Sequence, residues 1–485
     1  MSYIGRQLNL PASTVQLTAE GAITAGKPCI VEADGDVAQV AGNSASEAVG
    51  SAVVFQSQSI FDTSVVYDVN ADRVVIAYRN PDNSNYGTAV VGTVSGTSIS
   101  FGTPVVFESA STNSISIVYD ANAQKTVIAY RDEGNSSYGT AIVGTVSGTS
   151  ISFGTPVVYA SVNASFNSAV YDSNAQKIVI GYKNNTADNY GYGIVGTVSG
   201  TSISFGSATA FESATTFDIG SAFDSTNNKV VIAYRDAGNS SYGTAVVGTV
   251  SGTSISFGTA AAYNSSSVSG ISVAYDVNAQ KIVIAYKDTA SGLNEGMAVV
   301  GTVSGTSISF GTPAEFDARS NFASAAYDAT AQKVVIAYED ADGSDYGKVV
   351  VCTISGTSIT FSTPYTFESA STESVAAAYN SSAGKVVIGY RDVGNSGYGT
   401  AIVYQTPYES TNLTSENFIG FAENDCTDNG LATIQLGGAV NDKQTGLTAG
   451  QTYFLQTDGT IGTTADSPSV TAGTAVSSTE ILVKG

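Results

Sequence analysis

The sequence predicts an all-β protein in which a seven-bladed β-propeller is inserted into a small β-barrel or sandwich module. Three observations support this fold class: a 52-residue repeat, four β-like segments within each repeat, and the loss of the fourth segment from the last repeat. A four-stranded blade repeated around a ring is the architecture typical of this pattern. We expect the last blade to be closed by a strand from the N-terminal part of the chain.

An aromatic residue followed by an acid or amide marks each repeat. The seven aromatic positions are spaced 52 residues apart, and we number the repeats 1 to 7 from them: Tyr67, Tyr119, Tyr171, Phe223, Tyr275, Tyr327 and Tyr379. The stretch GTVSGTSISFG recurs without change at 92–102, 144–154, 196–206, 248–258 and 301–311. A one-residue insertion in repeat 5, near 287–296, is cancelled before Tyr327.

Each repeat contains four segments rich in β-branched residues and separated by turn residues. In repeat 2 they are 113–120, 125–131, 138–146 and 149–159. Period-two alternation and Gly, Asn, Asp and Ser punctuation predict four antiparallel strands, with Ser147-Gly148 at a hairpin. The Asp-x-Asn turns after the first strand favour an Asx turn over a calcium site.

The ends of the repeat region predict ring closure rather than an open solenoid. After Val403 the repeat pattern stops, so repeat 7 lacks its fourth strand. Residues 50–57 align with 102–109, and we expect them to pair with 398–403 as the missing strand. Closure would remove exposed sheet edges. The predicted domains are therefore a propeller over 47–407 and a composite β module from 1–46 plus 408–485.

Charge and composition exclude several function classes. The net charge of −22 disfavours nucleic acid as a partner, because phosphates would be repelled. No apolar run is long enough for membrane insertion, and the first 13 residues do not resemble a signal peptide. The chain has no histidine, so it lacks the commonest general base and metal ligand, and we predict no catalytic residue, metal or cofactor.

The three cysteines give no disulfide framework. Cys352 lies in a third strand and is expected to be an inert buried thiol, whereas pairing of Cys29 with Cys426 stays open.

Strand order places the second-to-third-strand loops and the repeat-to-repeat connections on one face, away from the tails. Most of these loops begin with a basic residue and end with Tyr-Gly, groups that suit carbohydrate recognition. The candidate binding residues are Arg79, Tyr86, Arg131, Tyr138, Lys183, Tyr190, Arg235, Tyr242, Tyr346, Arg391 and Tyr398. The alternative is an ordinary loop whose tyrosine covers the end of the repeat. The Ser/Thr-rich connections at 108–114 and 368–374 are also expected to be loops on this face.

The terminal segments resemble small β modules of tailed-bacteriophage virion proteins of the fibre and decoration type. The phrases that carry the resemblance are AITAGKPCIVEADGDVAQV, NFIGFAENDCTDNGLATIQLGG, GLTAGQTYFLQTDGTIG and AGTAVSSTEILVKG. The repeat itself resembles repeats in phage and marine bacterial surface proteins. The resemblance implies a structural protein of the virion surface, made in the host cytoplasm without a signal peptide, with capsid, collar or tail proteins as partners.

Three functions follow as hypotheses. The favoured one is a non-enzymatic surface protein, anchored by the terminal module and displaying the propeller for adhesion to a host-surface glycan. The second is a purely architectural decoration protein without a ligand. The third, an enzyme acting on a polysaccharide, is disfavoured by the absence of His and Trp and by the symmetry of the loops. The oligomeric state stays open, with a homo-oligomer as one alternative.

Overall fold

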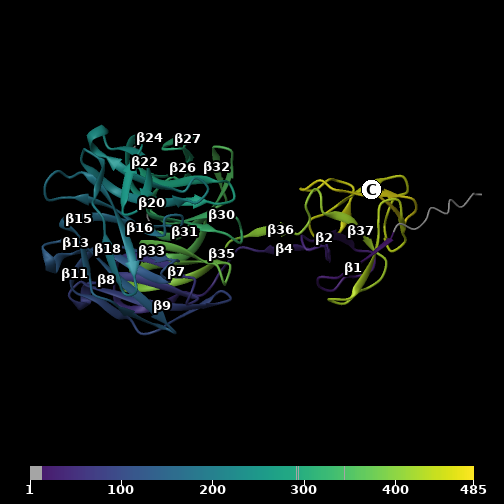
Figure 1. Cartoon of the computed structure of the whole chain (residues 1–485), viewed down its shortest axis with the longest axis horizontal. Helices are drawn as coiled ribbons and strands as arrows, with labels where there is room; N and C mark the ends of the chain where they lie inside the picture. The colour runs from purple at the N-terminus through teal and green to yellow at the C-terminus, as the bar shows by residue number, and fades with distance from the viewer. Residues whose placement is uncertain (1–13, 291, 293, 343, 485) are drawn as a thin grey trace, which may run out of the picture. The chain divides into compact units, whose positions relative to one another are not determined.

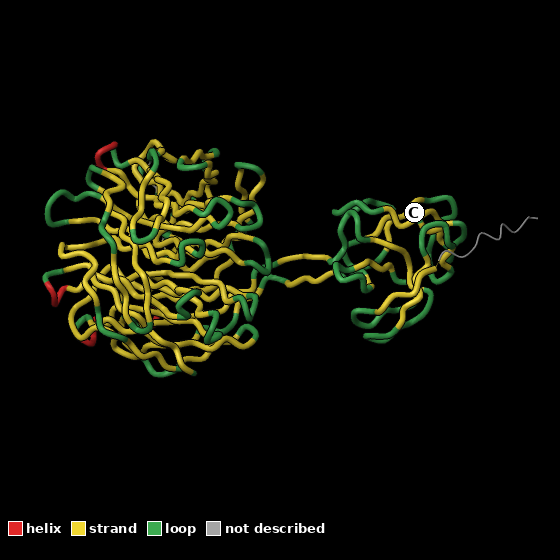
Figure 2. The backbone as a smooth tube through the Cα atoms, in the orientation of Figure 1, coloured by secondary structure: helices red, strands yellow, loops and turns green. Residues whose placement is uncertain are grey.

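The computed structural model of the chain describes residues 14–484 apart from 291, 293 and 343. The absence of a signal peptide was predicted from residues 1–13, which lie outside the described residues, as does part of the loop around the insertion in repeat 5. The chain divides into two compact units, 46–406 and 1–45 with 407–485, which we call the repeat unit and the terminal unit. Antiparallel strands dominate both units (Figures 1 and 2), and the described residues contain no α-helix. The prediction of an all-β fold is confirmed.

The second and third strands of each repeat form the best buried hairpin of the unit, because both are continuous apolar runs. Val75, Ile76 and Ala77, for example, are fully buried in the second strand of repeat 1. The second strands are β8 (Arg73–Asn80), β12 (Lys125–Asp132), β16 (Lys177–Asn184), β21 (Lys229–Asp236), β25 (Lys281–Asp288), β30 (Lys333–Asp340) and β34 (Lys385–Asp392). The third strands are β9 (Tyr86–Ser95), β13 (Tyr138–Ser147), β17 (Gly191–Ser199), β22 (Tyr242–Ser251), β26 (Glu295–Ser304), β31 (Tyr346–Ser355) and β35 (Tyr398–Gln405).

The first strand of most repeats is the second half of a long strand that begins at the outer edge of the preceding repeat. β11, for example, pairs with β9 near Val105 and with β12 from Thr112 onward. The strands involved are β7 (Phe61–Asp68), β11 (Val105–Asp120), β15 (Val157–Asp172), β20 (Thr216–Asp224), β24 (Ala261–Asp276), β29 (Ser320–Asp328) and β33 (Tyr365–Asn380). In repeats 4 and 6 the outer part is separate, as β19 (Thr209–Glu212) and β28 (Ala314–Asp317).

This crossing strand corrects two expectations. The segments 108–114 and 368–374 are not loops but parts of β11 and β33, because bulges let the chain change partner without leaving the extended conformation. The predicted fourth strand is also two strands, since Gly-Thr-Pro at 102–104 interrupts it. Its first part is a short hairpin strand: β10 (Ser98–Phe101), β14 (Ser150–Phe153), β18 (Ser202–Phe205), β23 (Ser254–Phe257), β27 (Ser307–Phe310) and β32 (Ser358–Phe361).

The first strands contact one another in cyclic order. β7 contacts β11, each following first strand contacts the next, and β33 of repeat 7 returns to contact β7. Seryl hydroxyls join neighbours, as where the Ile117 amide donates to Ser64 Oγ at 3.2 Å and the Ala169 amide to Ser116 Oγ at 3.0 Å. Hydrogen-bonded sheets run from one repeat into the next through the crossing strands, and the described strands contain no ladder that closes on itself.

The N-terminal part of the repeat unit supplies the outer strand of repeat 7. β6 (Val53–Ser59) pairs antiparallel with β35, with Val53 opposite Ala401 and Val54 opposite Thr400. The two-residue β5 (Ala48–Val49) extends this pairing to Tyr404 and Gln405. The predicted pairing of 50–57 with 398–403 is therefore present.

The residue that ends each first strand, an aspartate or in repeat 7 Asn380, caps the following turn. Asp120 Oδ1 accepts hydrogen bonds from the amides of Asn122 at 3.0 Å and Ala123 at 2.9 Å. The adjoining tyrosine reaches the preceding repeat, because the Tyr119 hydroxyl accepts a hydrogen bond from the Asn70 amide at 3.2 Å. The Asx-turn interpretation is confirmed, and the aromatic–acid pair serves both the turn and the contact between repeats.

The terminal unit contains two five-stranded sheets built from both ends of the chain. The first has the order β1 (Thr14–Thr18), β38 (Leu431–Gln435), β37 (Phe418–Ala422), β2 (Pro28–Val31), β3 (Val37–Gln39). The second has the order β39 (Val440–Asn441), β43 (Ile481–Val483), β42 (Thr471–Ala475), β40 (Thr452–Leu455), β41 (Ile461–Gly462). Buried residues of both sheets, including Ile30, Phe421, Leu455 and Ile481, share one apolar core. A two-stranded ribbon, β4 (Gly42–Ala45) with β36 (Tyr408–Thr411), completes the unit.

Across the residues that the structure describes, no helix has the length and apolarity needed to cross a membrane.

Candidate functional site

Each predicted basic residue and tyrosine of a repeat lie at the same end of that repeat. The basic residue precedes the last residue of the second strand, and the tyrosine opens the third strand. In repeat 2, Arg131 is opposite Gly139 and Asp132 is opposite Tyr138. The same register holds for Arg79 with Tyr86, Arg235 with Tyr242 and Arg391 with Tyr398. Tyr190 lies one residue before β17, and Tyr346 is opposite Asp340.

All four predicted arginines form ion pairs within their own repeats. Arg79 Nε lies 3.0 Å from Asp62 Oδ2, and Arg235 Nε lies 3.1 Å from Asp218 Oδ2. Arg131 pairs with Glu133, and Arg391 pairs with Glu373, both at 2.6 Å. Burial raises the pKa of the Asp62 and Asp218 carboxyls, and the paired arginines oppose this effect. These guanidinium groups are therefore held in fixed positions.

Two phenylalanines bring together basic residues of neighbouring repeats. The Arg79 and Arg391 guanidinium carbons lie 5.1 and 4.5 Å from the centre of the Phe61 ring. Around Phe217, Lys183 Nζ lies at 3.8 Å and the Arg235 guanidinium carbon at 4.4 Å. Lys183 is only 5% exposed. The predicted basic residues thus already make cation–π contacts or ion pairs with other residues of the protein.

The loop that carries the tyrosine is a capped 3-10 turn in four repeats. The turns are η1 (Pro81–Asn83), η2 (Glu133–Asn135), η3 (Ala237–Asn239) and η4 (Val393–Asn395). In η2, Asp132 Oδ1 accepts a hydrogen bond from the Asn135 amide at 3.1 Å, and Ser136 follows with φ of 57°. The predicted tyrosines are half-buried. These contacts give the Asp-x-Gly-Asn-Ser-Ser-Tyr motif a structural role, while ligand binding by its tyrosines stays a prediction.

The glycine after each tyrosine admits an aromatic ring from the outer strand. A β-carbon at Gly87 would overlap the Phe107 ring, and one at Gly139 would overlap Tyr159. The Phe107 ring packs edge-on against Tyr130, with 5.2 Å between centres. Tyr-Gly is therefore a packing motif at the end of the repeat.

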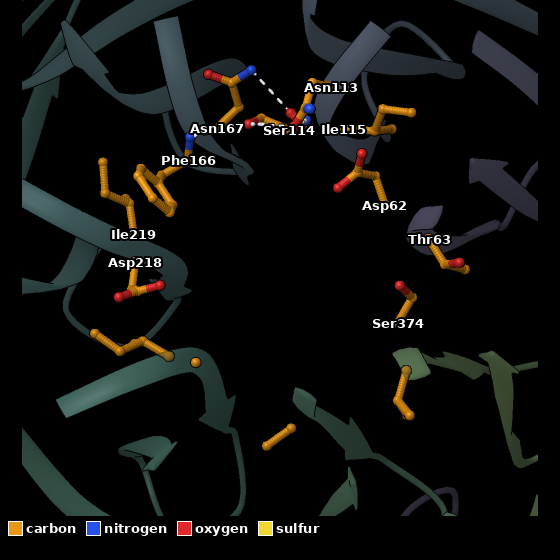
Figure 3. Close-up of a pocket in the computed structure, with 14 residues that line it drawn as sticks. Asp62, Thr63, Asn113, Ser114, Ile115, Phe166, Asn167, Asp218, Ile219 and Ser374 are labelled. Atoms are coloured by element: carbon orange, nitrogen blue, oxygen red, sulfur yellow. Dashed lines mark hydrogen bonds between the residues drawn. The ribbon is translucent and has the colours of Figure 1, made fainter. Parts of the chain in front are cut away.

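The main cavity of the repeat unit lies where the first strands begin. This central cavity of about 400 Å³ is lined by residues of all seven repeats, and Figure 3 shows their side chains around one opening. The residues that line it are Asp62, Thr63, Asn113, Ser114, Ile115, Phe166, Asn167, Asp218, Ile219, Gly270, Ile271, Ala323, Ser374 and Val375. Within this set, Asn167 Nδ2 donates to the Ser114 carbonyl at 3.0 Å.

A bulge in each first strand turns these residues toward the cavity. The register shifts, for example, between Phe61 and Ser64 in repeat 1. The bulge residues adopt positive φ, an unusual conformation for residues with a side chain: 53° at Asp62, 51° at Ser114, 54° at Phe166, 47° at Asp218, 59° at Gly270 and 50° at Ser374. The sequence prediction missed this ring. Its signal was present, since positions 61–63 and their equivalents 52 residues apart vary from repeat to repeat, while the second strand that follows hardly changes.

Repeat 5 departs from the others beside this cavity. A second cavity of about 290 Å³ is lined by Asp218, Ser269, Gly270, Lys287, Ser320, Asn321 and Ala323, and we call it the Ser269 cavity. It shares Asp218, Gly270 and Ala323 with the central cavity. Lys287 Nζ donates to Asn321 Oδ1 at 2.9 Å, and Asn321 Nδ2 donates to Glu339 Oε1 at 3.1 Å.

Within the described residues, one acidic group has the spacing to hold a metal ion: Asp317, Asp340 and Asp342. Lys348 pairs with Asp340, and Arg319 Nε lies 3.5 Å from Asp342. The Tyr338 hydroxyl donates to Asp317 at 2.7 Å. Protein cations and a hydroxyl therefore already bind these carboxylates.

All three cysteines are free thiols, so Cys29 and Cys426 do not pair. Burial raises the pKa of Cys29 to about 12 and also raises that of Cys352. Cys352 is buried, as predicted.

No protein-family model and no curated protein matches the chain. Solved structures do resemble it. The BP39L lectin from Burkholderia pseudomallei has a TM-score of 0.52 at 11% identity, over 76% of this chain and 99% of the lectin. A protein of unknown function from Dyadobacter fermentans has a TM-score of 0.47 at 12% identity, over 74% of this chain and 99% of that one. SapL1 lectin, solved with alpha methyl fucoside, has a TM-score of 0.39 at 12% identity, over 74% and 97% of the two chains. The chain thus shares its all-β fold with a bacterial lectin.

Proposed function

We propose that the chain is a non-enzymatic carbohydrate-binding protein. The observation that carries this proposal is the central cavity, where carboxylate, amide, hydroxyl and aromatic side chains from different repeats face one opening. Such groups bind sugars by hydrogen bonds to hydroxyls and by packing of rings against C–H groups. The fold shared with BP39L lectin supports the same function. The arginine-paired carboxylates Asp62 and Asp218 suit fixed recognition better than proton transfer.

We further propose that the repeat unit is a seven-bladed β-propeller. The cyclic order of contacts among the first strands and the pairing of β6 with β35 support this architecture. In a propeller, the mouth of the central channel presents equivalent residues of every blade to one ligand. Several weak sites on the same face would also add their affinities for a polymeric glycan.

A binding experiment on the full chain tests the carbohydrate proposal. A glycan array should retain the folded protein, and Phe166→Ala in the central cavity should weaken binding about tenfold, as expected for the loss of a buried aromatic contact. Tyr138→Ala with Tyr242→Ala tests the predicted loop tyrosines separately. Lys125→Ala, at the opposite end of β12, is the matched control and should bind normally. A folded wild-type chain that binds no glycan would contradict the proposal.

The location on a virion is a separate proposal. It rests on the resemblance of the terminal segments to phage virion proteins, which assigns the anchor to the terminal unit and surface display to the repeat unit. Immunogold labelling with antibodies to the repeat unit should decorate the outside of phage particles that carry this chain. Labelling of the disrupted particles alone would contradict surface display.

A further inference from the structure

The Ser269 cavity lies where repeat 5 has two small residues in succession, Ser269 and Gly270. Repeats 1 and 4 have Phe-Asp there, at Phe61-Asp62 and Phe217-Asp218, and repeat 5 has Ser269-Gly270. The phenylalanine and aspartate in repeats 1 and 4 contact the adjacent basic residues. Gly270 has φ of 59°, close to the 53° of Asp62 and the 47° of Asp218, so a residue with a side chain adopts the same φ in repeats 1 and 4.

The walls of this cavity carry groups that are already oriented. Lys287 Nζ is bonded to Asn321 Oδ1 at 2.9 Å, and the Asn321 amide is in turn bonded to Glu339 at 3.1 Å. On the other side, Arg235 holds the Asp218 carboxylate at 3.1 Å. Ser320 is 1% exposed and lines the same space. Ordered hydrogen-bonding groups of this kind lower the entropy cost of binding.

The charges at the cavity favour an anionic ligand. Asp218 is the one carboxylate among the lining residues, and Arg235, which lies outside the lining, pairs with it. The charge of Lys287 is therefore left for a ligand to balance. Glu339 lies behind Asn321, and burial raises its pKa to about 7, so near neutral pH it is only partly ionised. This cationic environment is confined to the cavity, since the whole chain has a net charge of −22.

We infer that the Ser269 cavity is a specific subsite for one carboxylated sugar residue, a deepening that rests on the proposed carbohydrate-binding function. The sugar carboxylate contacts the Lys287 ammonium, and ring hydroxyls bond to Asp218, Asn321 and Ser269. The volume of about 290 Å³ is near the lower limit for small-molecule pockets and suits one sugar ring. The adjoining central cavity leaves room for the next residue of a polymer.

The test uses titration calorimetry of the full chain with methyl glycosides of glucuronic, galacturonic and N-acetylneuraminic acid, together with methyl glucoside and methyl galactoside. At least one acidic glycoside should bind at least fivefold more tightly than the neutral ones. Lys287→Gln should remove this preference. Lys281→Gln, at the other end of β25, is the matched control and should leave the preference unchanged.

The decisive variant combines Ser269→Phe with Gly270→Asp, which copies the sequence of repeats 1 and 4 into repeat 5. It should fold with an unchanged melting temperature and lose binding of the acidic glycoside. A folded double variant that binds as the wild type does, or equal affinity for acidic and neutral glycosides, would overturn the inference. If the glycan array still retains that variant, carbohydrate binding stands and only the subsite is wrong. If the wild-type chain binds nothing on the array, the proposed function itself fails.

Discussion

Gly50 approaches the carbonyl oxygen of Thr97 so closely that a β-carbon at position 50 would overlap it. The same relationship joins Gly102 to Thr149, Gly154 to Thr201, Gly206 to Thr253, Gly258 to Thr306 and Gly311 to Thr357. In each case the threonine belongs to the Ser-Gly-Thr-Ser hairpin of the following repeat. Repeat 7 lacks that hairpin. In repeat 6, the residue equivalent to these glycines is Ser362. The glycine is therefore required only where a neighbouring hairpin occupies the space.

Gly102→Ala should destabilise the repeat unit, because the clash is with backbone that cannot rotate away. We expect a loss of about 3 kcal/mol in the free energy of unfolding, at the upper end of overpacking effects. Ser362→Ala is the matched control and should cost about 1 kcal/mol, since it removes only the hydrogen bond that the Val351 amide donates to Ser362 Oγ at 3.0 Å. Chemical denaturation of both variants measures the difference. Equal losses of stability in the two variants would show that the close approach of Gly102 to Thr149 does not require glycine.

Phe55→Ala tests whether β6 stabilises the repeat unit as much as the outer strand of another repeat does. Phe55 is 6% exposed and packs with Tyr78 of repeat 1 in a cluster that includes Val403 of repeat 7. Truncation should cost about 3–5 kcal/mol, as for other buried aromatic residues. Phe107→Ala removes the equivalent ring between repeats 1 and 2 and should cost the same. A much smaller loss for Phe55→Ala would mean that the ends of the repeat unit are not joined in solution.

Glu339→Gln should make stability less dependent on pH. Burial raises the pKa of Glu339 from its ordinary value of 4.5 to about 7. The folded chain therefore binds more protons than the unfolded chain between these values, and stability falls as pH rises from 4.5 to 7. The variant should be more stable than wild type by up to about 3 kcal/mol at pH 8, and equal to it near pH 4. Thermal unfolding at pH 4, 6 and 8 measures this, and a constant difference across pH would contradict the assignment.

Gln124→Gly should stabilise the turn after the first strand of repeat 2. Gln124 has φ of 54°, a conformation that costs a residue with a side chain about 1 kcal/mol, and repeat 7 has Gly384 with φ of 63° in the same place. Part of this gain is lost because glycine makes the unfolded chain more flexible, so we expect a net gain of about 0.5 kcal/mol. Gly384→Gln is the reciprocal variant and should lower the free energy of unfolding. Changes of the same sign in both variants would rule out the backbone explanation.

Several features of this protein followed from local pattern. The number of repeats, the apolar second and third strands, the turn aspartates and the source of the missing strand all depend on periodicity and residue type, which are visible in one dimension. The location of basic residues and tyrosines at one end of each repeat followed from strand order alone. The Ser/Thr-rich connections were mispredicted because a bulged strand and a polar loop have similar composition.

The strand content, the repeat spacing and the segment that pairs with the last repeat were predictable from the residues alone, because backbone pairing depends on local periodicity. Which side chains meet became clear from the three-dimensional arrangement. Asp62 reaches Arg79 within repeat 1, Phe217 lies between Lys183 and Arg235 of two repeats, and Ser269 leaves a cavity. Each outcome depends on the size and charge of side chains that strand register and packing between repeats bring together.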